Sequence, residues 1–234
     1  MTLYLETMSL ILQIETATSS CSVALAKDGS AIAVKEINQR NIHAEVITLF
    51  IEELLNSAGV KYNDLDAIAV SCGPGSYTGL RIGISTAKGL CFALDKPLIA
   101  IETLEAMAAG VRRRNGGSIN TQMLLCPMID ARRMEVFTAV FDASGNRIMP
   151  TKAEIIDGNS FNELLACNKI LFFGDGAAKC EAVLGENSNA RFFPGFVNSA
   201  ADLSQSAFEK FSKNEFEDVA YFEPYYLKDF IGKK

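Results

Sequence analysis

Two spacings of apolar residues alternate along this chain, and their order predicts a mixed α/β fold. Short apolar runs bounded by turn residues are typical of strands, whereas apolar residues three and four apart over a longer stretch are typical of helices. The first half is predicted to follow the order βββαβαβ, with a hairpin turn at Asp28-Gly29. The predicted strands are 10–15, 21–26, 31–37, 67–70 and 98–101, and the predicted helices are 43–58 and 80–94.

The second half follows the same two spacings less regularly. A flexible linker is expected over 114–118, where Asn-Gly-Gly-Ser follows the arginines. The predicted helices are 103–113, 179–184 and 202–213, and the predicted strands are 122–129, 135–141 and 170–173.

A glycine-rich turn over residues 71–81, Ser-Cys-Gly-Pro-Gly-Ser-Tyr-Thr-Gly-Leu-Arg, separates a predicted strand from a predicted helix. Such a turn can hold a phosphate on free backbone N–H groups, or it can let two helices or chains approach closely. Gly73, Gly75 and Gly79 are one residue too widely spaced for the dinucleotide fingerprint, and no Gly-Lys-Ser/Thr follows as in a P-loop. The loop alone therefore favours a structural turn.

The predicted helices 43–58 and 80–94 carry more apolar surface than one face of a sheet can cover. On the second, Arg81 and Lys88 are the only charged residues. Small residues on it would let another helix approach closely: Gly83, Ala87, Gly89 and Ala93. Either the rest of the chain or another protein covers this excess, and the pattern does not favour one of the two.

Composition limits the classes of function. The 234 residues carry a formal net charge of −6, which argues against a general polyanion-binding surface. The run Arg112 to Arg114 is expected to be a solvated helix end. Six cysteines without a C-x-x-C motif predict small buried side chains in a reducing compartment and no zinc site. No signal sequence or membrane span is recognised, so a cytoplasmic protein is expected.

His43 is the single histidine of the chain. A two-histidine metal site is therefore impossible within this chain, and a Ser-His-Asp triad would have to use this residue. Its place at the start of a predicted helix favours a side chain that is exposed or that neighbours the helix cap. We expect no catalytic residue and no metal site.

Several ordered motifs resemble the TsaB (YeaZ) family, the dimerisation subunit of the bacterial machinery that makes threonylcarbamoyladenosine in tRNA. The Gly-Pro-Gly-Ser-Tyr-Thr-Gly-Leu-Arg-Ile-Gly segment is the most specific of them, with Tyr77 where the family often has Phe. The other matching segments are 11–16, 101–104, 128–137, 174–177 and 224–227.

The resemblance implies an α/β fold of the actin/sugar-kinase/Hsp70 (ASKHA) type, with two related subdomains that face each other across a cleft. It implies subdomains over 9–103 and 104–234, after an irregular extension over 1–8, with the last helix able to pack back on the first subdomain. By analogy, a vestigial nucleotide cleft would be formed by Glu15, Thr16, Ser19, Gly174, Asp175 and Gly176. Glu15 stands where the family usually has Asp, and its longer side chain would displace a magnesium ion.

The resemblance further implies that the chain pairs with the transferase TsaD through its first two helices. The expected interface residues are Ile47, Phe50, Ile51, Leu54, Gly83, Ala87 and Leu90. The ATPase TsaE would then join the pair, tRNA would bind only within the complex, and the same helices could form a homodimer when TsaD is absent. The chain itself would need no cofactor, with ATP or ADP not expected to bind.

Two alternatives remain beside this scaffold role. The first is a stand-alone ATP-binding enzyme of the same superfold, for which Asp130 and Asp175 are the candidate carboxylates at strand ends, although both are expected to cap turns. The second is a peptidase, a label once attached to this superfamily, which would depend on His43.

Overall fold

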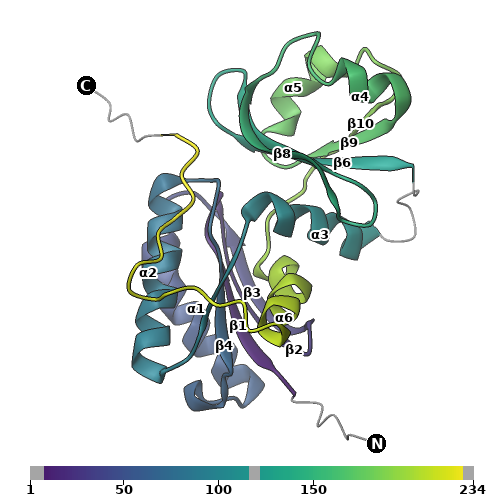
Figure 1. Cartoon of the computed structure of the whole chain (residues 1–234). Coiled ribbons are helices and arrows are strands. Elements are labelled where there is room, and N and C mark those ends of the chain that lie inside the picture. The colour runs from purple at the N-terminus through teal and green to yellow at the C-terminus, as the bar shows by residue number, and fades with distance from the viewer. Residues whose placement is uncertain (1–7, 116–121, 229–234) are drawn as a thin grey trace, which may run out of the picture.

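The computed structural model describes residues 8–115 and 122–228 and shows two lobes, each built around a five-stranded mixed sheet (Figure 1). The first sheet has the order β3-β2-β1-β4-β5, and the second has the order β10-β9-β6-β7-β8. In the first, β1 pairs antiparallel with β2 and parallel with β4; in the second, β6 pairs antiparallel with β7 and parallel with β9. The two lobes thus share a topology, as the predicted fold class requires.

The first lobe follows the predicted order βββαβαβ. Asp28 and Gly29 both have positive φ, which the tight turn between β2 and β3 requires. Its elements are β1 (Leu10–Glu15), β2 (Ser20–Lys27), β3 (Ser30–Asn38), α1 (His43–Ala58), the short 3₁₀ helix η1 (Tyr62–Asp64), β4 (Ala67–Ser71), α2 (Tyr77–Leu94) and β5 (Leu98–Ile101).

The second lobe contains three elements that the sequence did not predict: the edge strand β8, the short helix α4 and the short strand β10. The chain then forms η2 and α6, where one longer helix was predicted. The elements are α3 (Thr103–Asn115), β6 (Met123–Asp130), β7 (Glu135–Phe141), β8 (Arg147–Ile155), α4 (Asn162–Cys167), β9 (Lys169–Phe173), α5 (Ala177–Leu184), β10 (Ala190–Phe193), the 3₁₀ helix η2 (Ala200–Leu203) and α6 (Ser204–Ser212).

Helix α2 begins three residues earlier than predicted, at Tyr77 rather than Leu80. The cause is Ser76, whose side-chain oxygen accepts a hydrogen bond from the Gly79 N–H at 3.2 Å and caps the helix. Of the predicted linker 114–118, Arg114 and Asn115 belong to α3, and the rest lies outside the described residues. Residues 1–7 of the predicted extension also lie outside the described residues.

Both faces of the first sheet are covered. Helices α1 and α2 pack on one face, around Leu12, Ile14 and Val70. The other face is covered by α3, η2 and α6, which lie after β5 in the chain (Figure 1). The return of η2 and α6 to the first sheet ties the two lobes together.

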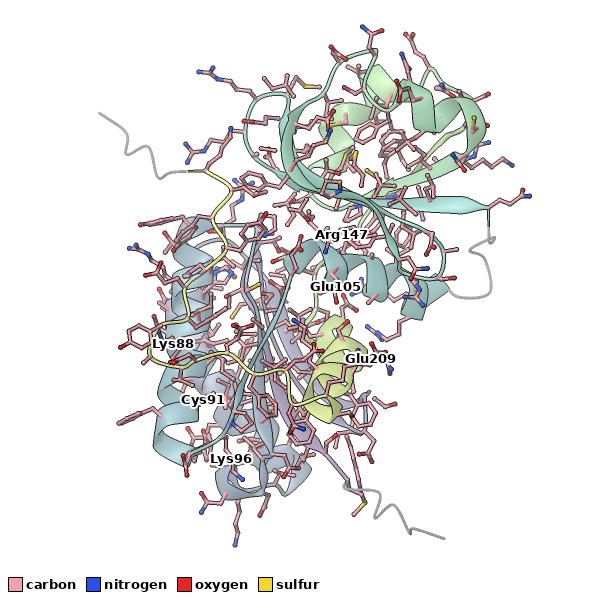
Figure 2. The ribbon with its side chains drawn as sticks, in the orientation of Figure 1. Lys88, Cys91, Lys96, Glu105, Arg147 and Glu209 are labelled. Atoms are coloured by element: carbon pink, nitrogen blue, oxygen red, sulfur yellow. The ribbon has the colours of Figure 1, made fainter. Side chains whose placement is uncertain are left out.

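Helix α3 lies between the two sheets (Figure 1). Leu104, Met107 and Val111 pack against the second sheet, while Ala106 packs against the first. Arg147 of β8 pairs with Glu102 at 2.8 Å and lies 3.9 Å from Glu105, which places these charges between the lobes (Figure 2). Among the described residues, no helix is both long and apolar enough to cross a membrane.

Candidate functional site

The glycine-rich loop between β4 and α2 packs tightly against the turn between β1 and β2. A Cβ atom at Gly75 would overlap the carbonyl oxygen of Ala17, and one at Gly79 would overlap that of Thr16. Gly73 has a φ of +118° and faces the carbonyl oxygen of Tyr225. These glycines are required because backbone from elsewhere in the chain approaches them closely.

Several N–H groups that a phosphate could use are already bonded within the protein. The Ser76 N–H donates to the Ala17 oxygen at 2.6 Å, the Gly79 N–H to the Ser76 hydroxyl, and the Gly73 N–H to the Thr103 hydroxyl at 3.1 Å. The loop is therefore a structural turn that locks α2 onto β1, as its spacing favoured.

Glu15, at the end of β1, lies in a closed polar cluster. Its side chain is 1% exposed and accepts a hydrogen bond from the Ala17 N–H at 2.6 Å. Burial raises its pKa from 4.5 to about 7, although the hydrogen bond from Ala17 acts in the opposite direction. The Ser71 hydroxyl and the Asn198 amide nitrogen are buried without a hydrogen-bond partner.

The segment around η2 closes this cluster. The Ala200 N–H donates to the Ser22 hydroxyl at 3.0 Å, and the Ser204 hydroxyl donates to the Gln13 side-chain oxygen at 3.0 Å. Asp202 is 4% exposed and is held by Arg113 and Arg114 at 2.8 and 2.5 Å. Arg112 to Arg114 are exposed in the last turn of α3, as predicted. The sequence did not predict that two of them, Arg113 and Arg114, also neutralise a buried carboxylate.

The other residues of the predicted cleft have structural contacts of their own. The Thr16 hydroxyl donates to the Gly79 oxygen at 2.8 Å, and the Ser19 hydroxyl donates to the Asn38 side chain at 2.7 Å. Gly174 and Gly176 pack against the end of β6, where the Gly176 N–H donates to the Met128 oxygen at 3.0 Å. The structure thus brings Thr16 together with the glycine-rich loop and Gly174–Gly176 together with β6.

Asp130 caps a turn, as predicted, whereas Asp175 bonds to the end of β6 instead of to its own turn. Asp130 accepts a hydrogen bond from the Arg132 N–H at 2.9 Å and pairs with Lys179, and Asp175 accepts one from the Asp130 N–H at 3.0 Å.

The described residues contain no group of three or more histidine, cysteine, aspartate or glutamate side chains that could hold a metal ion. Burial raises the pKa of Cys91 and Cys126 to about 12, so neither thiol is an activated nucleophile.

The expectation that His43 is exposed is wrong, since only 6% of it is accessible. Its Nε2 lies 2.9 Å from the Thr18 oxygen and 3.2 Å from the Ser20 oxygen. Both partners are carbonyl acceptors, so Nε2 carries the proton and donates it. His43 therefore anchors the start of α1 to the β1–β2 turn and has no free nitrogen on that side to act as a base.

Five of the seven predicted interface residues belong to the chain's own core, which corrects the predicted surface. Side chains of α1 and α2 at these positions point toward the first sheet, because one face of each helix must cover it. The buried five are Ile47, Ile51, Leu54, Gly83 and Ala87. Of the other two, Phe50 lies toward β3, with Lys35 Nζ 5.2 Å from its ring, and Leu90 is partly buried.

The outward face of the same two helices carries a different set of residues. Leu49 of α1 is 53% exposed and Phe92 of α2 is 86% exposed. On α2, Ser85, Gly89 and Phe92 are exposed, and helical spacing places the half-buried Ile82, which also packs against the core, at the edge of the same side. None of the four is charged. A Cβ atom at Gly89 would meet nothing within 4 Å, so the chain's own packing does not require glycine there. We call Leu49, Ile82, Ser85, Gly89 and Phe92 the outer helical face.

Part of the apolar excess is covered by the C-terminal strap, residues 217–228, which runs beside α2. Val219 and Phe222 pack into the first core, and Lys88 donates to the carbonyl oxygens of Ala220 and Phe222 at 3.2 and 3.0 Å. Figure 2 shows Lys88 on the α2 side that faces the strap. That the rest of the chain covers part of this surface was one of the two alternatives, but the spacing of apolar residues did not predict the strap itself, because the strap has no regular pattern.

Comparison with known proteins agrees with this architecture. The sequence model described as "TsaD: tRNA N6-adenosine threonylcarbamoyltransferase" matches residues 33–227. The tRNA threonylcarbamoyladenosine biosynthesis protein TsaB of Escherichia coli K12 is 41% identical over 138 residues, 59% of this chain and 57% of that protein. TsaB of Bacillus subtilis is 36% identical over 131 residues, 56% of this chain and 54% of that protein. The chain thus spans about half the length of these curated relatives.

Solved structures extend the similarity over nearly the whole fold. YeaZ from Pseudomonas aeruginosa has a TM-score of 0.78 at 28% identity, covering 94% of this chain and all (100%) of that one. A 2-hydroxyisocaproyl-CoA dehydratase activator from Clostridium difficile has a TM-score of 0.50 at 10% identity over 91% of this chain and 99% of that one, which shows the fold alone.

The topology and these structures define the class: an α/β protein with the two-lobed ASKHA fold. Within this class, the chain belongs to the family that the TsaD sequence model describes, and to its TsaB (YeaZ) members.

Proposed function

We propose that this chain is a non-catalytic scaffold subunit in tRNA threonylcarbamoyladenosine biosynthesis. It binds and supports TsaD, which transfers a threonylcarbamoyl group to the adenosine beside the anticodon of tRNA. TsaE joins this pair, and tRNA binds only to the complex. The names of the relatives support the pathway, and the outer helical face supports the mode of action.

Gly89 is the observation that carries the proposal. Glycine within a helix costs about 1 kcal/mol relative to alanine, and nothing in the chain's own fold needs a glycine at this position. A partner helix that approaches α2 closely would need it. Leu49 of α1 and Phe92 of α2 are large apolar side chains left in solvent, which a partner would cover. The same face would serve a homodimer when TsaD is absent.

The closed polar cluster around Glu15 supports a subunit without its own nucleotide chemistry. A carboxylate that holds hydrated magnesium must reach solvent or ligand, whereas Glu15 is 1% exposed beneath η2. His43 has its Nε2 committed to two carbonyl oxygens, which disfavours a peptidase. The chain therefore requires no ATP, ADP or metal in this proposal.

Reconstitution tests the role. TsaD, TsaE, tRNA and the threonylcarbamoyl donor are assayed with and without this chain, and the modified nucleoside is quantified. The proposal predicts transfer only when the chain is present, no transfer by the chain alone, and full activity for Glu15→Gln. Transfer by the isolated chain would contradict the scaffold role. Transfer by TsaD and TsaE at the same rate without this chain would contradict any role of the chain in the reaction.

A further inference from the structure

The turn between β6 and β7 presents two arginines side by side at the surface. Arg132 and Arg133 are exposed, and in the described part of the chain no carboxylate forms an ion pair with either guanidinium. The acidic residues closest in sequence are already paired, Asp130 with Lys179 and Glu135 with Lys228. Both arginine charges are therefore available to an outside anion.

The backbone of this turn is held in an uncommon conformation. Arg132 and Arg133 have φ values of +73° and +48°, a region that bulky side chains rarely adopt. The turn is fixed by three hydrogen bonds: the Asp130 carboxylate accepts from the Arg132 N–H at 2.9 Å, the Ala131 N–H donates to the Glu135 oxygen at 3.1 Å, and the Glu135 N–H donates to the Arg132 oxygen at 3.1 Å. Two long cationic side chains are thus presented from a rigid base.

A third cation comes from the other lobe. Arg40 follows β3, is exposed, and acts electrostatically on the carboxyl groups of Asp130 and Asp175. Its guanidinium therefore lies within electrostatic range of the β6–β7 turn. Cations from both lobes gather at this place although the whole chain has a net charge of −6.

We infer that Arg132 and Arg133, with Arg40 beside them, bind backbone phosphates of the tRNA in the assembled complex. This inference rests on the proposed function, which brings tRNA to the chain. Guanidinium groups match phosphate oxygens in charge and in planar, two-point geometry. Phosphate contacts of this kind position an RNA without reading its sequence.

The acidic surface of a protein is the competing occupant. Phosphates fit better because the two adjacent arginines can meet successive phosphates of one strand, and because this cationic turn lies on the second lobe, away from the outer helical face. The test therefore separates RNA affinity from protein assembly.

The experiment measures binding of fluorescent tRNA to the complex with TsaD and TsaE across a range of salt concentrations. The variant Arg132→Asn/Arg133→Asn removes both charges, and asparagine tolerates positive φ, so the turn keeps its shape. Arg132→Lys/Arg133→Lys keeps both charges. The matched control, Lys61→Ala/Lys96→Ala, removes two charges at the end of the first lobe remote from the second, where Figure 2 shows Lys96.

The asparagine variant is expected to bind tRNA about tenfold more weakly and to lower the slope of log affinity against log salt by about two. The lysine variant is expected to keep the salt slope but to bind more weakly than the wild type, because an ammonium group cannot make the two-point contact, and the control stays within about threefold of the wild type. Unchanged affinity of the asparagine variant in an intact complex would overturn the inference and leave the proposed function standing. If only the asparagine variant fails to assemble with TsaD and TsaE, the inference is also overturned, and the arginines bind a protein partner instead. A wild-type chain that does not assemble with TsaD would contradict the proposed function itself.

Discussion

The Thr16 hydroxyl donates a hydrogen bond to the Gly79 carbonyl oxygen at 2.8 Å and joins the β1–β2 turn to the first turn of α2. One turn further along α2, Gly83 faces the same hydroxyl, and a Cβ atom there would overlap it. The small residues of α2 therefore have two different causes. Gly79 and Gly83 allow the helix to pack on its own sheet, whereas Gly89 faces open space.

This difference predicts opposite effects of the same substitution on stability. Gly83→Ala is expected to lower the free energy of unfolding by about 2 kcal/mol, because the new methyl group overpacks against Thr16. Gly89→Ala is expected to raise it by up to about 1 kcal/mol, because alanine is the better helix former and meets no neighbour. Urea unfolding of both variants measures the two changes, and equal effects would refute the distinction.

Glu15 predicts a pH dependence of stability. Its pKa in the folded chain, about 7, lies above the ordinary value of 4.5, so the folded state binds the proton more tightly than the unfolded state. The stabilisation is complete below pH 4.5 and is lost as the pH rises through 7. A shift of this size corresponds to about 3 kcal/mol.

Glu15→Gln removes this titration while keeping an oxygen that can accept the Ala17 N–H. The free energy of unfolding of the variant relative to the wild type is therefore expected to be higher at pH 8 than at pH 5. Chemical denaturation of both proteins at the two pH values measures the difference. A relative stability that does not change with pH would show that Glu15 is not buried as described.

Asp202 predicts unequal contributions from its two arginine partners. Its carboxylate is 2% exposed, whereas the side chains of Arg113 and Arg114 are 50% and 28% exposed. Arg114 also donates to the Val197 oxygen at 3.0 Å, and its guanidinium carbon lies 4.6 Å from the centre of the Phe196 ring. Arg114→Ala is expected to cost about 2 kcal/mol and Arg113→Ala less than about 1 kcal/mol, because solvent screens the more exposed pair. Thermal or urea unfolding measures the stability that each variant loses, and Arg114→Ala is expected to lose more.

The C-terminal strap depends on Lys88. Replacing this residue with methionine keeps the length and apolar stem of the side chain but leaves the Ala220 and Phe222 carbonyl oxygens without their donor. Lys88→Met is expected to speed proteolytic cleavage within residues 217–228 several-fold, without changing the unfolding midpoint of the lobes by more than a few degrees. Limited proteolysis followed by mass spectrometry measures this, and Lys96→Met serves as the control. Identical cleavage of both variants would show that Lys88 does not hold the strap.

Local spacing predicted the first lobe closely because its strands and helices are regular and bounded by turn residues, and its short strands β4 and β5 are continuous buried apolar runs. Helix α1, closed by Gly59 with a φ of +66°, and β5 were predicted residue for residue. β8, α4 and β10 were missed because β8 is an edge strand with mixed exposure, and the other two are only 6 and 4 residues long. Such short elements are stabilised by tertiary contacts rather than by their own pattern.

The candidate sites were harder to predict because burial depends on contacts between distant segments. In the sequence, Ile51 and Ala87 belong to an apolar surface that exceeds one face of a sheet. The structure shows that both are buried against the first sheet. Glu15 and Thr16 belong to a motif that resembles a phosphate turn, but η2 covers Glu15 from more than 180 residues away in the chain. The outer helical face was present in the sequence as apolar and small residues, yet only the structure separates its members from the core.

Light scattering of the chain mixed with TsaD tests the central claim most directly, with Gly89→Arg as the variant and Gly158→Arg as its control. Gly158 also has open space around its Cβ position but lies in the second lobe, so the two variants add the same side chain at two unhindered sites. If the outer helical face binds TsaD, the wild type and the control give the mass of a complex, and Gly89→Arg gives the masses of separate proteins. Gly89→Arg is expected to be at least as stable as the wild type, because arginine is a better helix former than glycine. A Gly89→Arg chain that still forms the full complex with TsaD would contradict the account.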